Sequence, residues 1–239
     1  MSQKQTNKQS SNDRPVSQNA IHECVRYIIC REGSKLPIKR IEIQKYLSTT
    51  CELQGNQINS VIIEANKLLK RVYGCKLVQV EVRSGVQYIV VLTEESESLT
   101  STYTDSHQRR LLVAALMHIF MTGGPVKEDD MWKFLMEANL LEENDNAGRK
   151  LLTNHFTRQM YLTYTKDGEG DLARNVFQWG QRAVEEVPKM FLLNKMAQVR
   201  NVNHLAYCSH LQYTVKFRNR RKTIWILPTL LLVFYYTIN

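Results

Sequence analysis

The sequence predicts a mainly helical α+β protein made of two similar modules in tandem. Each half of the chain shows the same order of patterns: three stretches with helical periodicity, then two β-rich runs separated by a turn. The 239 residues are 43% hydrophobic, which is enough apolar material for one or two ordinary cores. Three helices followed by a hairpin is the element order of a winged-helix module, so the expected architecture is two tandem winged-helix modules.

The first half opens with an amphipathic pattern over residues 20–31. Its apolar residues recur at i, i+3, i+4 and i+7, namely Ile21, Cys24, Val25 and Ile28. Gly33 ends this helix, and Leu36-Pro37-Ile38 is expected to be a short extended link into a second helix. A third helix and the two strands of a hairpin are expected at residues 56–73, 76–82 and 86–92.

The second half begins with the stretch that organises it, residues 109–122. This stretch is apolar nearly all round, which predicts a core helix buried on most sides. Gly123-Gly124-Pro125 stops it, because two residues with free φ precede one that lacks an N–H. A second helix is expected from about Lys127, since acidic residues follow where the helix dipole favours them.

The later elements of the second half are shorter. Thr153 is predicted to cap a short third helix with His155, Phe156 and Arg158, and the acidic run before it is interpreted as a solvated loop of Glu142, Glu143 and Asp145. The two strands of a second wing are expected at residues 161–165 and 175–179. A helix opened by Gly180 is expected over residues 180–187, and a last helix over 188–199.

These patterns give a predicted division of the chain. The expected parts are a disordered polar N-terminus over residues 1–18, winged-helix module A over 19–98, a linker over 99–106, winged-helix module B over 107–200, and a basic and apolar C-terminal tail over 201–239. Residues 20–199 carry 23 basic and 22 acidic residues, whereas residues 200–239 carry six basic residues and no acidic one. The net charge of +9 is therefore weak evidence for a nucleic-acid-binding fold.

Several ordered strings carry a family resemblance. LLVAALMHIFMTGG, MWKFL, RKLL, YLTY and FQWGQRA followed by PKM resemble the MAGE homology domain family, whose fold is two winged-helix modules in tandem. KLPIKRIEIQKYL, KRVYGCKLVQVE and YIVVL are most similar to its branch that forms the MAGE-like subunit, non-SMC element three, of the SMC-five/six complex. The resemblance covers about residues 20–199. Gln181 stands where the family usually has Pro, and Lys127 stands near where it often has a Thr helix cap.

The resemblance implies a non-catalytic scaffold in the nucleus that acts in DNA repair and chromosome maintenance. It would bridge a RING-type ligase subunit of the ubiquitin or SUMO pathway and the kleisin of the SMC-five/six complex. The family grips the RING partner through a hydrophobic dipeptide, which corresponds here to Ile28 and Ile29. On a helix the two side chains lie about 100° apart, so one can face the core while the other turns toward its edge. Two ordinary core residues are the alternative interpretation.

Two further surfaces are candidates. For the kleisin we expect Met190 and Leu193 of the final helix, although the same residues could belong to the core. For DNA, basic residues on the third helix of module B and on the two wings could neutralise a few phosphates: Arg83, Arg149, Lys150, Arg158, Lys166 and Arg174. Such contact with double-stranded DNA would be weak, sequence-independent and sensitive to salt. A plain solvated face is the alternative.

No pattern predicts an enzyme, a metal site or a cofactor. No Gly-rich phosphate loop follows a strand, and no Ser, Cys or His lies in a recognisable nucleophile context. The five cysteines are odd in number and form no CxxC pair, which argues against a disulfide framework. Two other functions stay open: a general MAGE-type ubiquitin-ligase adaptor that recruits substrates, and a stand-alone DNA-binding regulator.

The last forty residues do not resemble the family. A basic stretch over 216–222 precedes the uncharged apolar run Ile224–Ile238, which Pro228 interrupts. Its fifteen residues fall short of the ~20 that a membrane-spanning helix needs. The run is interpreted as a tail anchor with a basic flank, as a non-native or alternatively spliced end, or as a segment that packs on the body. Membrane contact is expected only if the tail is an anchor.

Overall fold

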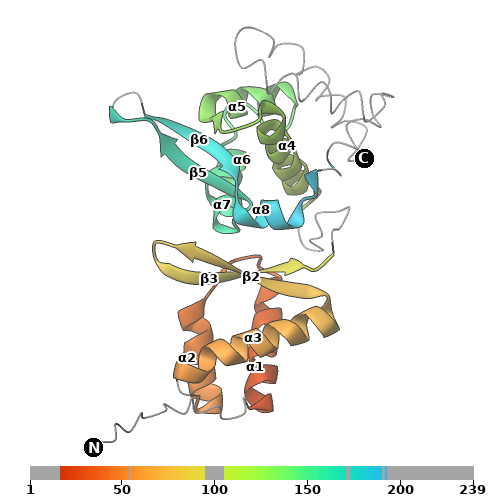
Figure 1. Cartoon of the computed structure of the whole chain (residues 1–239). Coiled ribbons are helices and arrows are strands. Elements are labelled where there is room, and N and C mark those ends of the chain that lie inside the picture. The colour runs from red at the N-terminus through yellow and green to blue at the C-terminus, as the bar shows by residue number, and fades with distance from the viewer. Residues whose placement is uncertain (1–16, 54, 95–104, 171–172, 190–191, 193–239) are drawn as a thin grey trace, which may run out of the picture.

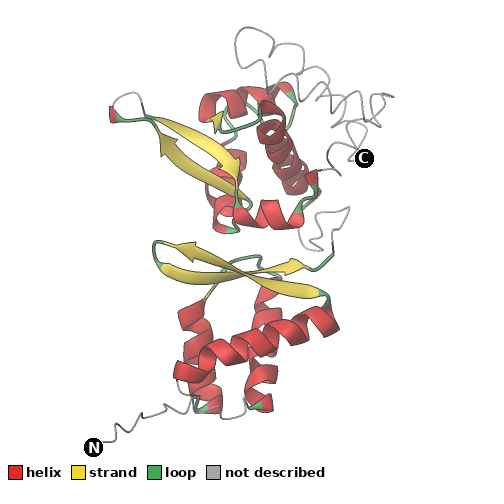
Figure 2. Cartoon of the chain, in the orientation of Figure 1, coloured by secondary structure: helices red, strands yellow, loops and turns green. Residues whose placement is uncertain are grey.

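The computed structural model describes residues 17–53, 55–94, 105–170, 173–189 and 192 (Figure 1). Helices and two small antiparallel sheets make up this part of the chain, as Figure 2 shows. Each sheet has three strands, in the orders β1-β3-β2 and β4-β6-β5. The predicted class, mainly helical α+β with two tandem winged-helix modules, is confirmed. The module boundaries at 98/99 and 200/201 lie outside the described residues and stay predictions.

Module A contains three helices below one sheet (Figure 1). Its elements are α1 (Gln18–Glu32), β1 (Ile38–Lys39), α2 (Arg40–Cys51), the 3₁₀ turn η1 (Gly55–Gln57), α3 (Ile58–Leu68), the π turn η2 (Leu69–Tyr73), β2 (Cys75–Val82) and β3 (Gly85–Leu92). The predicted helices and hairpin are confirmed. Gly74 follows η2 with φ 62°, a left-handed conformation that glycine adopts at no steric cost.

The link between α1 and α2 contains a strand that the sequence analysis missed. Ile38 and Lys39 pair with Tyr88 and Gln87 of β3, so the hairpin is one part of a three-stranded sheet. Module B repeats the arrangement with β4 (Val126–Lys127), in which Val126 lies opposite Phe177. A two-residue strand carries no periodicity, and its pairing depends on a partner about fifty residues away.

The core of module A is mainly aliphatic. The buried side chains come from α1, α2, α3, η2 and the sheet, and they are Ala20, Ile21, Cys24, Val25, Ile28, Ile38, Ile43, Leu47, Ile58, Val61, Ile62, Ala65, Leu69, Leu77, Tyr88 and Val90. Helix α1 contributes one face to this cluster, as its predicted amphipathic pattern requires.

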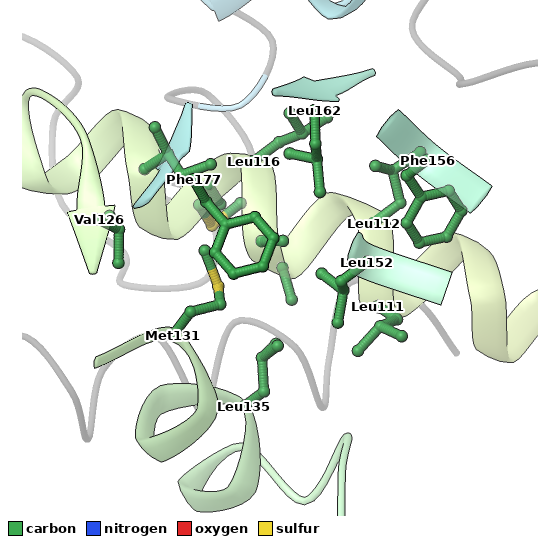
Figure 3. Packing of buried hydrophobic residues seen from close by; sticks show 14 of the residues in the cluster. Leu111, Leu112, Leu116, Val126, Met131, Leu135, Leu152, Phe156, Leu162 and Phe177 are labelled. Atoms are coloured by element: carbon green, nitrogen blue, oxygen red, sulfur yellow. The ribbon is translucent and has the colours of Figure 1, made fainter. Parts of the chain in front are cut away.

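Module B is built around α4 (Ser106–Thr122). Its other elements are β4, α5 (Glu128–Glu137), α6 (Asn146–Lys150), the π turn η3 (Leu151–His155), α7 (Phe156–Arg158), β5 (Leu162–Asp167), β6 (Arg174–Trp179) and α8 (Gln181–Glu186). Nine of the seventeen residues of α4 are buried, which confirms the predicted core helix. Figure 3 shows Phe177 of β6 and Phe156 of α7 among the aliphatic side chains of α4 and α5.

The start of the third helix in module B differs from the prediction. The helix begins at Asn146, and the Asp145 carboxylate caps it by accepting a hydrogen bond from the Gly148 N–H at 2.8 Å. Thr153 lies inside the helix, where its hydroxyl donates to the Arg149 carbonyl at 2.9 Å. The prediction that Thr153 is the cap was therefore wrong. The error arose because Asp145 was grouped with the solvated acidic run, whereas a carboxylate three residues before a free N–H is a strong cap.

Helix α8 follows β6 and packs on β3 of module A (Figure 1). Gly180 is the residue between β6 and α8, and it is buried against the Met160 carbonyl. Any Cβ at position 180 would collide with this backbone, so only glycine allows the chain to pass here. The predicted helix over 180–187 is confirmed, and it is the element that joins the two modules.

Candidate functional site

The Ile28–Ile29 pair splits between the core and its edge. Ile28 is fully buried in the module A cluster, and Ile29 is half-buried against the same cluster. The 100° step between neighbouring helical residues produces this division. Of the pair, Ile29 is the residue that a partner could touch, while Ile28 fixes how α1 is seated.

A network of tyrosines and charged groups covers the seam between α1 and α2. The rings of Tyr27 and Tyr46 stack with centroids 4.6 Å apart, and Arg31 donates to the Tyr27 hydroxyl at 2.7 Å. Arg26 donates to the Tyr46 hydroxyl at 2.9 Å and to the Glu23 carboxylate. Hydrogen bonds from Tyr46 and then Arg26 lower the pKa of Glu23. Tyr and Arg side chains held in place like this are typical of protein-binding surfaces.

The sequence analysis missed this network. The signal in the sequence is the i, i+4 spacing of Tyr27 and Arg31, which lies outside the apolar pattern that predicted the helix. The pairing with Tyr46 requires α2 to lie beside α1, which periodicity within one helix does not reveal.

The residues proposed for the kleisin, Met190 and Leu193, lie outside the described residues. Between them Leu192 is described, and it is 2% exposed within the module B core. Its N–H donates to the Pro188 carbonyl at 3.3 Å, and the Lys189 ammonium lies 5.5 Å from the centre of the Trp179 ring. The chain after α8 therefore returns to module B at Leu192, a core residue that the sequence analysis did not select.

Five of the six residues proposed for DNA are exposed. Lys150 and Arg158 lie on the third helix of module B, Lys166 and Arg174 on its wing strands, and Arg83 at the turn of the module A wing. Figure 1 shows both hairpins extending to the same side of the molecule. The sixth, Arg149, is half-buried, donates to the Glu143 carbonyl at 2.9 Å and lies 5.4 Å from the Trp132 ring centre. Arg149 is therefore largely engaged within its own module.

The joint between the modules is formed around Arg182 of α8, which is 1% exposed. Its guanidinium donates to the carbonyls of Val90 at 2.7 Å, Gln159 at 2.8 Å and Lys35 at 3.0 Å. It also pairs with the Glu186 carboxylate at 2.9 Å. Two of the three carbonyls belong to module A, so one buried cation links both modules.

Further contacts surround this cation. Glu186 accepts a hydrogen bond from the Tyr161 hydroxyl at 2.6 Å, and Glu185 pairs with Lys76 of β2 at 3.0 Å. Burial, followed by the charge of Glu186, raises the pKa of Tyr161. Tyr161 therefore keeps its proton and remains a donor. The sequence analysis noted Arg182 only as part of the FQWGQRA string.

Two buried titratable groups lie outside the joint. Burial lowers the pKa of His118 to about 4, and its ring stacks on Phe134 with centroids 4.1 Å apart. Burial raises the pKa of the Cys24 thiol to about 12. Each is thus held in its neutral form at physiological pH and packs as an apolar group. The Cys24 thiol has no thiolate character that would make it a nucleophile.

The described residues form neither a metal cluster nor a membrane-spanning helix. They contain no group of three His, Cys, Asp or Glu side chains placed to hold a metal ion. Over the same ranges, no helix has the length and apolarity needed to cross a membrane. The C-terminal tail that was considered as an anchor lies outside these ranges.

Comparison with known proteins gives curated relatives over most of the chain. The human "Non-structural maintenance of chromosomes element 3 homolog" is 29% identical over 187 residues, which cover 76% of this chain and 60% of the relative. The mouse protein of that name matches at 29% over 76% of this chain and 66% of its own length. Human "MAGE-like protein 2" is 28% identical over 82% of this chain and 16% of the relative. The chain thus spans less than two thirds of the length of these relatives.

A solved structure and a family model complete the comparison. A chain of the "Nse1-Nse3-Nse4 complex" superposes with a TM-score of 0.67 and 25% identity, covering 83% of this chain and 99% of that one. The MAGE homology domain model matches residues 24–110 and 86–190, which together cover most of both winged-helix modules. The chain belongs to the MAGE homology domain family.

Proposed function

We propose that the protein is a non-catalytic scaffold subunit of the SMC-five/six complex, acting in the nucleus in DNA repair and chromosome maintenance. It bridges a RING-type ligase subunit and the kleisin. The observation that carries this proposal is the match to a chain of the Nse1-Nse3-Nse4 complex over 99% of that chain, supported by the human and mouse element 3 homologues. Such a bridge needs two separate docking surfaces, and two modules can supply one each.

Module A is the proposed site for the RING partner. Ile29 supplies a half-buried apolar contact at the edge of the core, and Ile28 holds α1 in position through its burial in the core. The Tyr27–Tyr46 stack with its two arginines presents an ordered surface across α1 and α2. Ordered side chains lose little conformational entropy on binding, which favours affinity.

Module B is the proposed site for the kleisin, through Met190 and Leu193. Support comes from Leu192, the described residue between them, which is buried in the module B core. The Lys189 ammonium lies over the Trp179 ring, and this contact holds Lys189 against the end of β6. Apolar side chains next to a buried anchor are a common way to bind a partner helix.

Weak, sequence-independent binding of double-stranded DNA is the third part of the proposal. Arg83, Lys150, Arg158, Lys166 and Arg174 are exposed and lie on wings and the third helix of module B, where winged helices meet phosphates. Arg149 belongs to the proposed set, but its internal contacts make it the weakest contributor. Affinity for a duplex should fall as salt increases.

The RING assignment is tested by exchanging one half-buried residue. Ile29→Asp places a charge at the edge of the core, and we expect it to reduce binding of the purified RING subunit at least tenfold, the effect of losing about 1.4 kcal/mol. Ile63→Asp on α3 is the matched control, since Ile63 is 57% exposed and should leave binding unchanged. Circular dichroism checks that both variants fold. Undiminished binding by a folded Ile29→Asp protein would remove the assignment.

Identification of partners pulled from cells separates this function from its alternatives. Recovery of SMC subunits together with the kleisin supports the scaffold. A ligase recovered without SMC subunits would indicate a general MAGE-type ubiquitin-ligase adaptor. Recovery of DNA with neither would indicate a stand-alone DNA-binding regulator, and either of these results would overturn the proposal.

A further inference from the structure

Arg182 reaches across the joint to the backbone of module A. Its acceptors there are the carbonyls of Lys35, three residues after the end of α1, and of Val90, two residues before the end of β3. Main-chain oxygens move only when the chain moves. A hydrogen bond to a main-chain oxygen therefore restrains the position of a whole element, whereas a bond to a flexible side chain restrains only that side chain.

The Lys35 carbonyl is itself held in a defined place. Lys35 has φ 55°, a left-handed conformation, and its N–H donates to the Glu32 carbonyl at 2.9 Å. Next to it, the Ser34 carbonyl accepts a hydrogen bond from the Gln159 side chain at 3.3 Å. The turn that follows α1 is thus bound twice by module B, once by Arg182 and once by Gln159.

The second face of β3 completes the joint. Tyr88 and Val90 point into the module A core, so Ile89 and Val91 point to the opposite face, on which α8 packs. Both are buried, at 0% and 2% exposed. The joint therefore combines an apolar layer with one guanidinium, and water does not reach the cation.

Burial makes the arrangement specific for arginine. A cation excluded from water is tolerated only when its donors are satisfied, and a planar guanidinium offers five donors in a fixed fork. Here three carbonyls and one carboxylate accept hydrogen bonds from four of these donors. A lysine ammonium would be a single nitrogen with three donors, which cannot reach acceptors spread around the plane of the fork.

We propose that Arg182 is an orientation lock: it holds modules A and B in one relative arrangement, so that the two move and unfold as one body while it is in place. The proposal does not depend on which partners bind. Without the guanidinium, the apolar layer and the Lys76–Glu185 pair remain, and the modules keep their folds but lose their fixed relation.

The test compares three proteins: the unsubstituted chain, Arg182→Lys, and Val184→Ala as a control on the same helix, since Val184 is 52% exposed. We expect calorimetry to give one unfolding transition for the unsubstituted chain and the control, and two for Arg182→Lys. Amide hydrogen exchange should become at least about tenfold faster at residues 34–36 and 88–92 of Arg182→Lys, while the α3 core at residues 58–65 keeps its rate.

The amide exchange rate of α3 distinguishes a lock from simple destabilisation, because simple destabilisation would speed exchange in α3 as well. Glu186→Gln serves as a second variant if Arg182→Lys does not fold, because it leaves the guanidinium in place and removes its counter-charge. It should give the same pattern with a smaller change. Unchanged exchange at residues 34–36 and 88–92 in the variant tested, or two transitions in the unsubstituted chain, would overturn the lock.

Discussion

The first helices of the two modules hold equivalent places but have different surroundings. Helix α1 buries one face and leaves His22, Arg26 and Cys30 exposed, whereas α4 is buried on most sides. The two cores differ in the same sense, since that of module A is mainly aliphatic and that of module B contains Phe134, Phe156 and other rings. In the same architecture, the first helix can thus either leave one face exposed for partners or form the centre of the core.

The two sheets differ in a complementary way. In module A, the outer face of β3 is covered by α8, so that β3 is buried on both faces at its centre. In module B, β5 and β6 carry exposed residues toward their turn, including Lys166, Asp167 and Arg174. Module A therefore uses its wing to hold its neighbour, and module B leaves its wing in solvent.

The aromatic core of module B gives the largest expected effect on stability. Phe177 and Tyr88 occupy equivalent places, each opposite the short strand of its sheet. Phe177→Ala should cost about 3–5 kcal/mol of unfolding free energy, because the side chain is fully buried. Urea denaturation measures the loss. Tyr88→Ala is the comparison, and a larger loss there would contradict the view that module B depends more on its rings.

Acid should destabilise module B through His118. His118 in α4 and Ile28 in α1 occupy equivalent positions, because each lies four residues before the last residue of its helix, which is Thr122 in α4 and Glu32 in α1. The folded pKa of about 4 lies below the ordinary 6.5, so the stability that neutral His118 contributes is complete above pH 6.5. It is lost as pH falls from 6.5 toward 4, by about 3 kcal/mol.

The measurement is the urea midpoint of the chain and of His118→Leu between pH 7 and pH 4. The difference between the two proteins removes the contribution of the carboxylates, which titrate in both. The substituted protein should lose less stability over this range. Parallel curves would show that His118 has the same pKa in the folded and the unfolded protein, which would contradict a pKa lowered by burial.

The smallest expected effect on stability concerns the N-terminal caps of the third helices in the two modules. Asp145 caps the helix of module B with its side chain, while Gln57, which precedes α3, makes no such bond. Asp145→Ala should cost about 1 kcal/mol, and Gln57→Ala should cost close to nothing. Thermal unfolding followed by circular dichroism reports both changes. Equal losses at the two positions would mean that the Asp145 bond adds no stability of its own.

Much of the architecture could be predicted because it depends on local pattern. The apolar residues of α1 and α4, and the Gly123-Gly124-Pro125 stop, specify helices and their ends through neighbours three or four residues away. The short strands β1 and β4 could not be found in this way, and Asp145 was passed over because its partner N–H was assigned to a loop. One signal at the joint was readable, since Tyr88-Ile89-Val90-Val91 does not alternate, which is typical of a strand buried on both faces.

The sequence by itself determined the repeated module, the periodicity of its helices and the family to which the chain belongs. Only the tertiary structure decided what Arg182 does, because its acceptors at Val90 and Lys35 are 92 and 147 residues away. It also separated Ile29 from Ile28, and Arg149 from the exposed basic residues. Periodicity reports which side of an element is apolar, whereas the partner of a buried charge depends on which backbone oxygens folding brings within 3 Å of it.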